Sequence, residues 1–365
     1  MEQPSAILSL TLARNLVLRH GWNATDYQIL NPGMKLWFSK RKDAVVGYSD
    51  YGRVRVVAGA PICAEERFQS VLREFEQEAS EVSGVSVCYF AAGGRLEKTV
   101  SHSLQYAKVL LGAQPVWHPK SWPRILMEHP SLRAQLYRAR NKGVTVRTWP
   151  SGEAVKGHMG LNRCVREWLA SRPMPAMHFL VEPQTLERLW DRRLFLAEQD
   201  GEVVGFLVVD PITSRRGFLV EQIVQAWAAP NGTAELLVDA AFAAAMKQGL
   251  EYFTLGLSPL SLAILEKNDQ PFWLDFLFHW VRIHGSRFYN FQGLEHFKSK
   301  FAPDYWEPIH AISNQPSFTA GNLLAIAAVF GGGSPFKFLA LALGRALRQE
   351  YQWFYNRIRG KKWEI

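Results

Sequence analysis

A hairpin followed by a helix and a further strand can be read twice along this chain, and this repeat restricts its fold more than any other feature. In the first half, apolar runs at 44–48 and 54–58 flank Asp50-Tyr51-Gly52, a turn typical of a β-hairpin. A polar amphipathic helix is predicted at 65–81, and a short β-branched strand at 85–91. Strands that alternate with helices in this way predict a mixed α/β fold.

The second half repeats the same order. Its predicted strands are 194–199, 203–209, 217–227 and 252–257. Asp200-Gly201 is a strong hairpin signal between the first two, and an Ala-rich helix at 234–248 separates the last two. This order is typical of a GNAT-type acyltransferase half, in which the helix after the central strand points its N-terminus at the ligand. We predict an α/β (α+β) fold of two tandem GNAT-like halves, 1–150 and 151–312, with the active site in the second.

Composition agrees with two folded domains and excludes two other classes of protein. The chain has 365 residues, of which 48% are hydrophobic and 21% are charged, enough for a large core. Cys63, Cys88 and Cys164 lie far apart in no metal-ligand spacing, which excludes a disulfide scaffold. The histidines also lack metal-site spacing, so we predict no bound metal.

Residues 313–365 are predicted to form an amphipathic helical tail. Glycine and proline at 331–335 split its apolar part, 318–345, into pieces too short to span a bilayer. Residues 337–365 carry seven basic and two acidic side chains, more than half of the formal net charge of +9, with aromatic residues interleaved. This pattern is typical of a helix on an anionic membrane surface. A helix that caps the domain and shows its charges to water is the alternative.

An ordered set of short motifs carries a family resemblance. The motifs are Gly59-Ala60-Pro61, the basic helix 133–143, and the segments 229–232, 255–261, 287–294, 297–301 and 306–308. Across residues 31–308 they resemble the catalytic C-terminal domain of the aminoacyl-phosphatidylglycerol synthases, the family of phosphatidylglycerol lysyltransferases and multiple peptide resistance factors. Family members carry similar Tyr-Asn-Phe, Lys-x-Lys-Phe and Trp-x-Pro series near the end of that domain.

The resemblance implies an acyltransferase that moves an amino acid from its tRNA ester to a hydroxyl of phosphatidylglycerol or a similar lipid. Such a reaction alters membrane surface charge and gives resistance to antimicrobial peptides. It implies aminoacyl-tRNA as the donor, no cofactor, an anionic phospholipid membrane as partner, and a cytoplasmic, peripheral location at the inner face of the cell membrane. Family members usually carry a multi-span flippase domain ahead of this part. We expect this chain to be free-standing and to need a separate flippase.

One family motif is altered inside the expected site. Counted back from Asn231, the family's Asp-x-x-Arg falls on Glu221-Gln222-Ile223-Val224, so the acid is kept and the arginine is replaced by Val224. Glu221 follows apolar strand residues, where a carboxylate needs a partner or a function. We predict that Glu221 is catalytic, either as the base for the acceptor hydroxyl or as the holder of the donor's α-ammonium group. A salt bridge to Arg215 or Arg216 is the alternative.

Two lysines in the matched motifs are the other predicted catalytic residues. Lys298 and Lys300 cannot both point the same way, so we expect one to face the cleft and the other to face solvent. The residue in the cleft would contact a phosphate or a carbonyl oxygen.

Six further residues are predicted to bind substrate. They are Asn231, Ser258, Asn290, Arg133, Arg138 and Arg140. The arginines lie on one basic helix that could receive phosphates of the tRNA acceptor arm. A plain solvated helix face is the alternative for the arginines, and a turn-forming role is the alternative for Ser258 and Asn290.

Two other functions are compatible with the sequence. The first is a CoA-dependent GNAT-type acyltransferase, which the turn at 229–233 disfavours because CoA sites usually have a glycine-richer loop. The second is a non-catalytic, membrane-binding relative, for which Val224 is the main argument.

Overall fold

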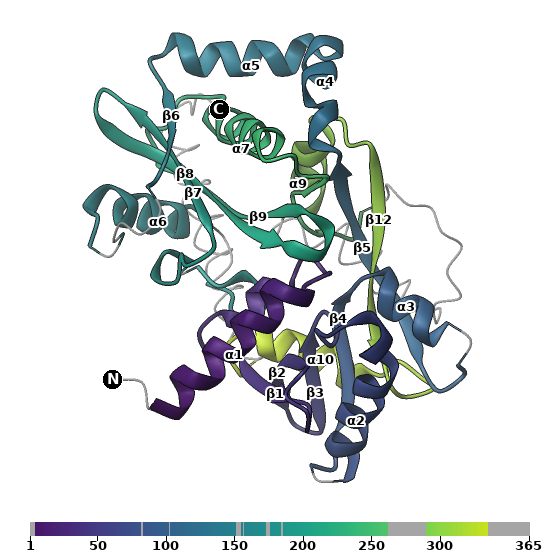
Figure 1. Ribbon diagram of the computed structural model, residues 1–365. Helices are drawn as coiled ribbons and strands as arrows, with labels where there is room; N and C mark the ends of the chain where they lie inside the picture. Colours follow the sequence, from purple (N-terminus) through teal and green to yellow (C-terminus); the bar gives the residue numbers. More distant parts are fainter. Residues whose placement is uncertain are drawn as a thin grey trace, which may run out of the picture.

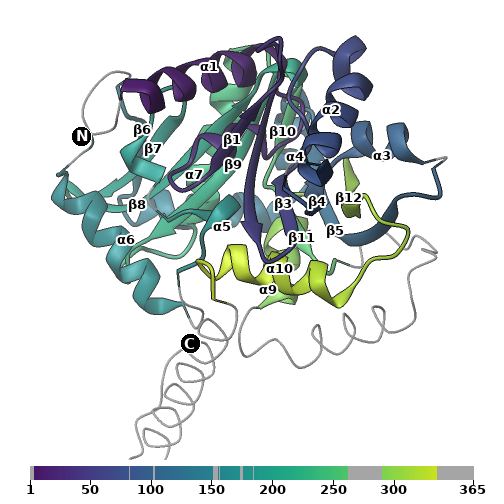
Figure 2. The same cartoon turned by 90° about the horizontal axis from the view of Figure 1, so that it is seen from below.

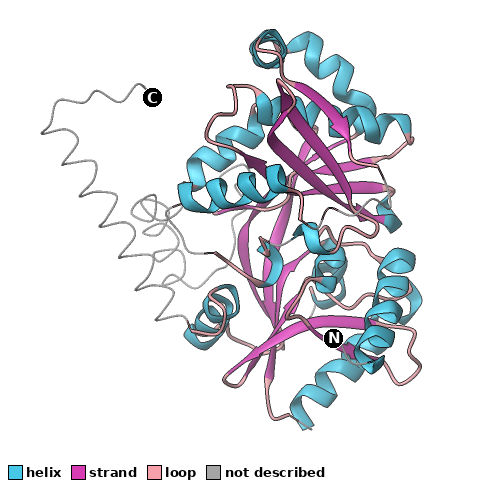
Figure 3. Ribbon diagram, turned by 90° about the vertical axis from the view of Figure 1, so that its left-hand side faces the viewer, coloured by secondary structure: helices cyan, strands magenta, loops and turns pink. Residues whose placement is uncertain are grey.

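One continuous sheet forms the centre of the molecule. The computed structural model describes residues 4–81, 83–101, 103–150, 155, 157–172, 176–183, 185–261 and 290–334. Within these residues the sheet has 12 strands and helices pack on both of its faces (Figures 1 and 3).

The first half contains an opening helix, a meander and one helical crossover. Its elements are α1 (Pro4–His20), the 3-10 helix η1 (Asp26–Leu30), β1 (Lys35–Phe38), β2 (Val45–Tyr51), β3 (Val54–Ala58), α2 (Phe68–Glu81), β4 (Ser86–Ala92), α3 (Gly94–Val100) and β5 (Ala107–Trp117). α2 buries one face with helical spacing, through Phe68, Val71, Leu72, Phe75 and Ala79. That face holds α2 on the sheet, and β3 and β4 pair in parallel on either side of the crossover.

The second half has the same plan. After α4 (Trp122–Glu128) and α5 (Pro130–Asn141), its elements are β6 (Thr145–Thr148), α6 (Met159–Ser171), β7 (Arg193–Gln199), β8 (Glu202–Ile212), β9 (Gly217–Gln225), α7 (Thr233–Lys247), β10 (Tyr252–Thr254), β11 (Ser258–Pro259), α9 (Phe291–Ser299), β12 (Tyr305–Ser313) and α10 (Ala320–Phe330). α7 connects β9 to β10, which pair in parallel as β3 and β4 do.

The two halves exchange strands. The order in the sheet is β1-β2-β3-β4-β12-β5-β10-β9-β8-β7-β6, with β11 paired to β5 beside this path. β5 leaves the first half and pairs with β10, while β12 leaves the second half and pairs with β4. β5 and β12 also pair with each other, antiparallel, from Tyr305 opposite Val116 to Ser313 opposite Ala107. They lie side by side where the halves join (Figure 1).

Helices cover both faces of each half. In the first half α2 and α3 pack on one face, while α1, η1 and α10 pack on the other. α10 lies along β2 and β3, below the sheet in Figure 2. In the second half α4, α5, α7 and α9 share one core around Trp117 and Phe242, and α6 covers the opposite face.

The predicted elements of both halves are present, with small changes in their bounds. The hairpins at β2–β3 and β7–β8, the helices α2, α5 and α7, and the strands β4, β9 and β10 are confirmed. The strands β1, β5 and β12 and the helix α6 were not predicted from the sequence. The division at residue 150 stays a prediction. The sheet is continuous across it, because β6 pairs with β7.

Part of the predicted tail is described. α10 is the first of its two apolar pieces, and its N-terminus has a capping box between Thr319 and Asn322. Residues 335–365, which contain the basic part of the tail, lie outside the described residues. In the part of the chain that is described, no helix is both long enough and apolar enough to cross a membrane.

Gly112 provides a test of the close antiparallel pairing between β5 and β11. Its φ is +145°, and a Cβ there would lie 2.2 Å from the backbone oxygen of Ser258. We expect Gly112→Ala to lower the free energy of unfolding in urea by about 1–3 kcal/mol, as overpacking usually does. Gly94→Ala is the control, because nothing lies within 4 Å of an added Cβ at that helical position. Equal unfolding midpoints for the two variants would contradict this close approach.

Candidate functional site

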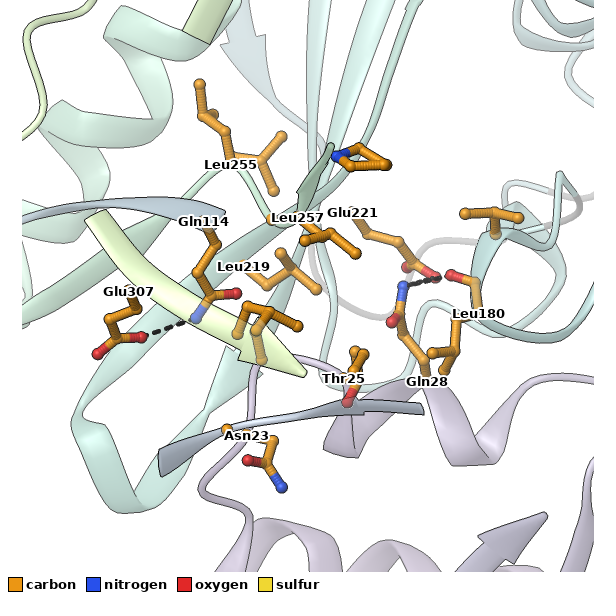
Figure 4. Close-up of a pocket in the computed structure, with 18 of the residues that line it drawn as sticks. Asn23, Thr25, Gln28, Gln114, Leu180, Leu219, Glu221, Leu255, Leu257 and Glu307 are labelled. Atoms are coloured by element: carbon orange, nitrogen blue, oxygen red, sulfur yellow. Dashed lines mark hydrogen bonds between the residues drawn. The ribbon is translucent and has the colours of Figure 1, made fainter. Parts of the chain in front are cut away.

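A large cavity lies between the two halves, where the carboxyl ends of β4, β9 and β10 come together. Its volume is about 1220 Å³. It is lined by selected residues within the segments 22–28, 65–69, 90–99, 180–182, 219–225, 255–259, 291–298 and 307–309. Asn23, Thr25 and Gln28 approach from the first half, opposite Leu219 and Glu221 of β9 (Figure 4). The cavity is therefore shared by the two halves, although the sequence placed the site in the second alone.

Glu221 lines this cavity from a β-bulge. Val208 of β8 pairs with Gln222 and Val209 pairs with Val220, which leaves Glu221 as the extra residue. A bulge turns its side chain away from the regular alternation of the strand. β9 continues beyond Glu221 to Gln225, close to the predicted strand at 217–227.

Arg192 is the main partner of Glu221. The Arg192 Nε lies 2.9 Å from Glu221 Oε2, and the Arg192 Nη2 donates a hydrogen bond of 3.1 Å to Oε1. Both side chains are at most 2% exposed. A salt bridge is therefore present, but with neither expected arginine: Arg215 pairs with Glu307 and Arg216 pairs with Glu251.

A second buried carboxyl group shares the same arginine. The Arg192 Nε donates a 2.7 Å hydrogen bond to Asp210 Oδ1, and Asp210 is fully buried on β8. Burial, and then the neighbouring Glu221 carboxylate, raise the pKa of Asp210 well above its ordinary value, although Arg192 opposes this shift. Burial therefore favours the protonated form of Asp210 beside the Glu221 carboxylate. With that proton bound, the group of one guanidinium, one carboxylate and one carboxylic acid is neutral.

Residues of the first half complete this group. Gln28 Nε2 and Asn31 Nδ2 each lie 3.4 Å from Glu221 Oε1, and Gln28 also donates a 2.7 Å hydrogen bond to the Leu180 carbonyl (Figure 4). Asn31 accepts a 2.7 Å hydrogen bond from Arg192 Nη2. Sequence reasoning missed Asp210, although an acid that follows the apolar residues 207–209 gives the same signal as Glu221. It also missed Arg192, Gln28 and Asn31, for which no local signal exists.

Lys298 lines the cavity from α9 and is buried. Its Nζ donates hydrogen bonds to the carbonyl oxygens of Gly256 (2.8 Å) and Leu257 (2.9 Å). Burial lowers the pKa of Lys298 to about 7. Near neutral pH this side chain is therefore divided between its charged and neutral forms, which is the range useful for proton transfer.

Lys300 lies outside the cavity lining. Its ammonium group forms an ion pair with Glu235 of α7 and lies 4.2 Å from the ring centroid of Phe297. The structure thus separates the two lysines. Lys298 is in the cavity, and Lys300 holds α9 against α7 instead of facing solvent alone.

The predicted substrate-binding residues are not gathered in the cavity. Asn231 is exposed in the turn before α7. Asn290 caps α9, because its Oδ1 accepts a 2.8 Å hydrogen bond from the Gly293 N–H. Ser258 is fully buried in β11, between the lining residues Leu257 and Pro259, and its Oγ has no hydrogen-bond partner in the described part of the chain.

The arginines of α5 are also away from the cavity. Arg133 donates to the carbonyl oxygens of Leu126 and Met127 at the end of α4. Arg140 forms a 2.7 Å ion pair with Asp239 of α7, and Arg138 is exposed. No contact of these residues tests the predicted binding of tRNA, which stays a prediction.

A polar network forms another part of the cavity wall, and sequence reasoning missed it. Arg215 Nη1 lies 3.1 Å from Glu307 Oε2, the Tyr252 hydroxyl donates 2.8 Å to the same oxygen, and Gln114 donates 2.8 Å to Glu307 (Figure 4). Burial alone would raise the pKa of Glu307, but the hydrogen bonds from these groups and the charge of Arg215 lower it. Gln114, Tyr252 and Glu307 come from three separate strands, and Arg215 lies in the turn between β8 and β9, so no sequence spacing reveals the network.

Val224 does not line the cavity. It is fully buried in an apolar cluster with Phe206, Leu161 and Cys164, beneath α6. An arginine in this place would put a charge into that core, so the family's arginine has no open site here.

Comparison with known proteins identifies the family. A family model described as "Phosphatidylglycerol lysyltransferase, C-terminal" matches residues 14–312. The chain belongs to this family. The resemblance read from the ordered motifs is thereby confirmed.

Relatives in this family are distant in sequence. Phosphatidylglycerol lysyltransferase from Bacillus subtilis (strain 168) is 26% identical over 289 residues, which are 78% of this chain and 33% of that protein. The protein of the same name from Staphylococcus xylosus is 23% identical over 306 residues, 82% of this chain and 35% of the relative. The chain spans about a third of the length of the curated relatives it matches.

Solved structures of the family share the fold. The C-terminal domain of a putative lysylphosphatidylglycerol synthetase from Agrobacterium fabrum has a TM-score of 0.75 and 21% identity, and the match covers 90% of this chain and 98% of that one. L-PGS from Bacillus licheniformis has a TM-score of 0.73 and 20% identity, with coverages of 87% and 95%. The predicted α/β fold of two GNAT-like halves is confirmed.

The role of the two carboxyl groups at Arg192 can be tested by measuring the free energy of unfolding of variants. In Glu221→Gln we expect Asp210 to lose its proton, so that its carboxylate replaces the lost charge. In the Asp210→Asn variant the carboxylate of Glu221 remains. Each single variant should therefore lose about 1 kcal/mol of unfolding free energy. The double variant leaves Arg192 buried without a counterion, so it should lose about 3–5 kcal/mol more. Additive effects in a urea-unfolding cycle would contradict a shared proton.

Proposed function

We propose that this protein transfers an aminoacyl group from aminoacyl-tRNA to a hydroxyl of an anionic membrane phospholipid, phosphatidylglycerol or a close analogue. The observation that carries the proposal is Lys298, a buried amine held by two carbonyl oxygens on the wall of a cavity large enough for two substrates. The names of the relatives give the substrate class. The reaction needs aminoacyl-tRNA as co-substrate and no cofactor.

Lys298 has the geometry of a general base. A neutral amine has two N–H groups and one lone pair, and the Gly256 and Leu257 carbonyls accept two N–H bonds. The lone pair is then left to accept the proton of the lipid hydroxyl as its oxygen attacks the ester carbonyl carbon. The bond from that carbon to the ribose oxygen breaks, and the Lys298 ammonium group returns the proton to the ribose oxygen.

Glu221 would hold the amino group of the donor. Arg192 already engages both of its oxygens, which fixes the Glu221 carboxylate in place as an anchor. A cationic α-ammonium group that enters the cavity would favour release of the Asp210 proton, and the two carboxylates and Arg192 would then carry one net negative charge. This charge would offset that of the donor.

We also propose a peripheral location on the inner face of the cell membrane. The support is the composition of residues 337–365, with seven basic and two acidic side chains among aromatic residues. Each basic residue close to an anionic surface contributes about 1 kcal/mol.

The donor is the first point to test. Purified protein with phosphatidylglycerol vesicles and aminoacyl-tRNA should form an aminoacylated lipid that mass spectrometry detects. Ribonuclease treatment of the donor should abolish this product, and acetyl-CoA should not restore it. Product formed after ribonuclease treatment would favour the CoA-dependent acyltransferase, and no product under any condition would favour the non-catalytic relative.

Lys298 gives a second test. Lys298→Met should lower kcat about 10²–10⁴-fold, the usual contribution of a general base. The kcat of the wild type should fall as the pH drops below about 7, because the pKa of the buried amine is about 7 and its charged form has no lone pair.

The free energy of unfolding should also depend on pH, and it should rise with pH as kcat does. Between pH 7 and 10 the unfolded state binds the extra proton, so the wild type gains stability relative to Lys298→Met as the pH rises.

The matched control for this test is Lys247→Met, which removes an exposed lysine at the end of α7. Its kcat and pH profile should equal those of the wild type. A Lys298→Met protein that is folded and keeps normal turnover would exclude Lys298 as the base.

A further inference from the structure

Three buried polar atoms on the first-half side of the cavity have no hydrogen-bond partner among the described residues. They are Nε and Nη2 of Arg95 and Oγ1 of Thr25. Both residues line the cavity, and neither takes part in the site described for the second half. Buried N–H groups of a guanidinium almost always have acceptors, so these atoms indicate a ligand that supplies them.

The space around these atoms is kept open by two glycines. A Cβ on Gly59, which follows β3, would lie 2.8 Å from Thr25 Oγ1, and a Cβ on Gly93, which follows β4, would lie 2.7 Å from Asn23 Oδ1. The Arg95 guanidinium is held in place by the Phe68 ring, 4.8 Å from its centroid. Arg95 is therefore positioned without using its N–H groups.

The charge on this wall favours an anion. Lys98 lies one helical turn after Arg95 on α3 and also lines the cavity. Glu65 is the acidic side chain on the same wall. Asp26 lies close by and accepts hydrogen bonds from the backbone N–H groups of Trp22 and Asn23. Burial outweighs these hydrogen bonds and raises the pKa of Asp26 to about 7, so its negative charge is reduced at neutral pH.

We propose that Arg95 and Thr25, assisted by Lys98, bind the phosphodiester of an anionic phospholipid headgroup. This inference rests on the proposed function, because it places the acceptor lipid in the cavity that Lys298 lines. A phosphodiester carries one negative charge and oxygen acceptors that suit the two N–H groups of Arg95 and the Thr25 hydroxyl. The two halves of the protein then have separate tasks: the first binds the acceptor phosphate, and the second supplies the reacting groups.

Apolar surface beside this subsite favours a lipid over RNA. Phe90, Ile309 and Phe330 line the same cavity, and the rings of Phe90 and Phe330 lie 5.0 Å apart. An RNA backbone would need a row of cations along its phosphates, whereas this wall combines a small basic group with apolar side chains. A phospholipid has both features, one phosphate and adjacent apolar chains.

The test measures binding of soluble, short-chain phosphatidylglycerol to the full chain by calorimetry. Arg95→Met keeps the stem over Phe68 and removes the N–H groups, and Thr25→Val keeps the shape and removes the hydroxyl. We expect Arg95→Met to weaken binding by about tenfold to a hundredfold, and Thr25→Val by several-fold, as expected for lost hydrogen bonds to a charged group. Arg73→Met, which removes an exposed arginine on α2 outside the cavity lining, is the matched control and should bind as the wild type does.

Further ligands identify what the subsite recognises. The uncharged short-chain diacylglycerol should bind weakly to every variant, because it lacks the phosphate. Unchanged phosphatidylglycerol affinity in folded Arg95→Met and Thr25→Val would overturn the proposal. It would also be overturned if only inorganic phosphate, or only a tRNA acceptor minihelix, lost affinity in these variants.

The thermal midpoint separates binding from folding. Neither side chain donates a described hydrogen bond to the protein, so the melting temperatures should not fall. If Arg95→Met does not fold, Thr25→Val and Arg95→Lys carry the same test. If these variants lose phosphatidylglycerol binding but the wild type transfers no aminoacyl group, the subsite is supported and the proposed function is rejected. Transfer with an unchanged KM for phosphatidylglycerol in Arg95→Met would reject the subsite alone.

Discussion

The pairing of β5 with β12 is the interaction on which the rest of the structure depends. Each strand leaves its own half and pairs in the sheet of the other half, and the two pair with each other along their length. Two sheets are thereby joined into one. The carboxyl ends of β4, β9 and β10 then open on a single cavity, because the joined sheet fixes how the halves face each other. Carboxyl ends of parallel strands are where α/β sheets usually bind ligands.

Charges buried around this cavity are stabilised in three different ways. Arg192 has two carboxyl groups, and burial raises the pKa of one of them, Asp210. Lys298 has backbone carbonyl oxygens, which orient its amine without providing a counterion. Arg95 has an aromatic ring and buried N–H groups without described partners. Each arrangement leaves a different capacity: an anchor for a cation, an amine that can exchange a proton, and donors for an anion.

Sequence reasoning found the residues whose signal is local. Glu221 and Lys298 were both singled out, Glu221 because its charge follows apolar residues and Lys298 because it lies in a matched motif, and both line the cavity. The same reasoning gave no warning that Lys300 pairs with Glu235, whereas the turn-forming alternative for Asn290 is close to its observed role as a helix cap. Gln28 and Asn31 could not have been found, because they meet Glu221 across more than 180 residues of chain. Such contacts depend on how the halves pack.

The sequence by itself determined the two repeated α/β units, because hairpin turns, the spacing of apolar residues and helix ends are set by neighbouring residues. The family motifs added the order of the segments and the class of reaction. Only the tertiary structure decided that β5 and β12 change halves, that Glu221 projects from a bulge, and that the two halves share one cavity. It also decided which charges lose contact with water. The lowered pKa of Lys298 and the raised pKa of Asp210 follow from that burial, which is a property of the whole packed chain and has no signature in any short segment.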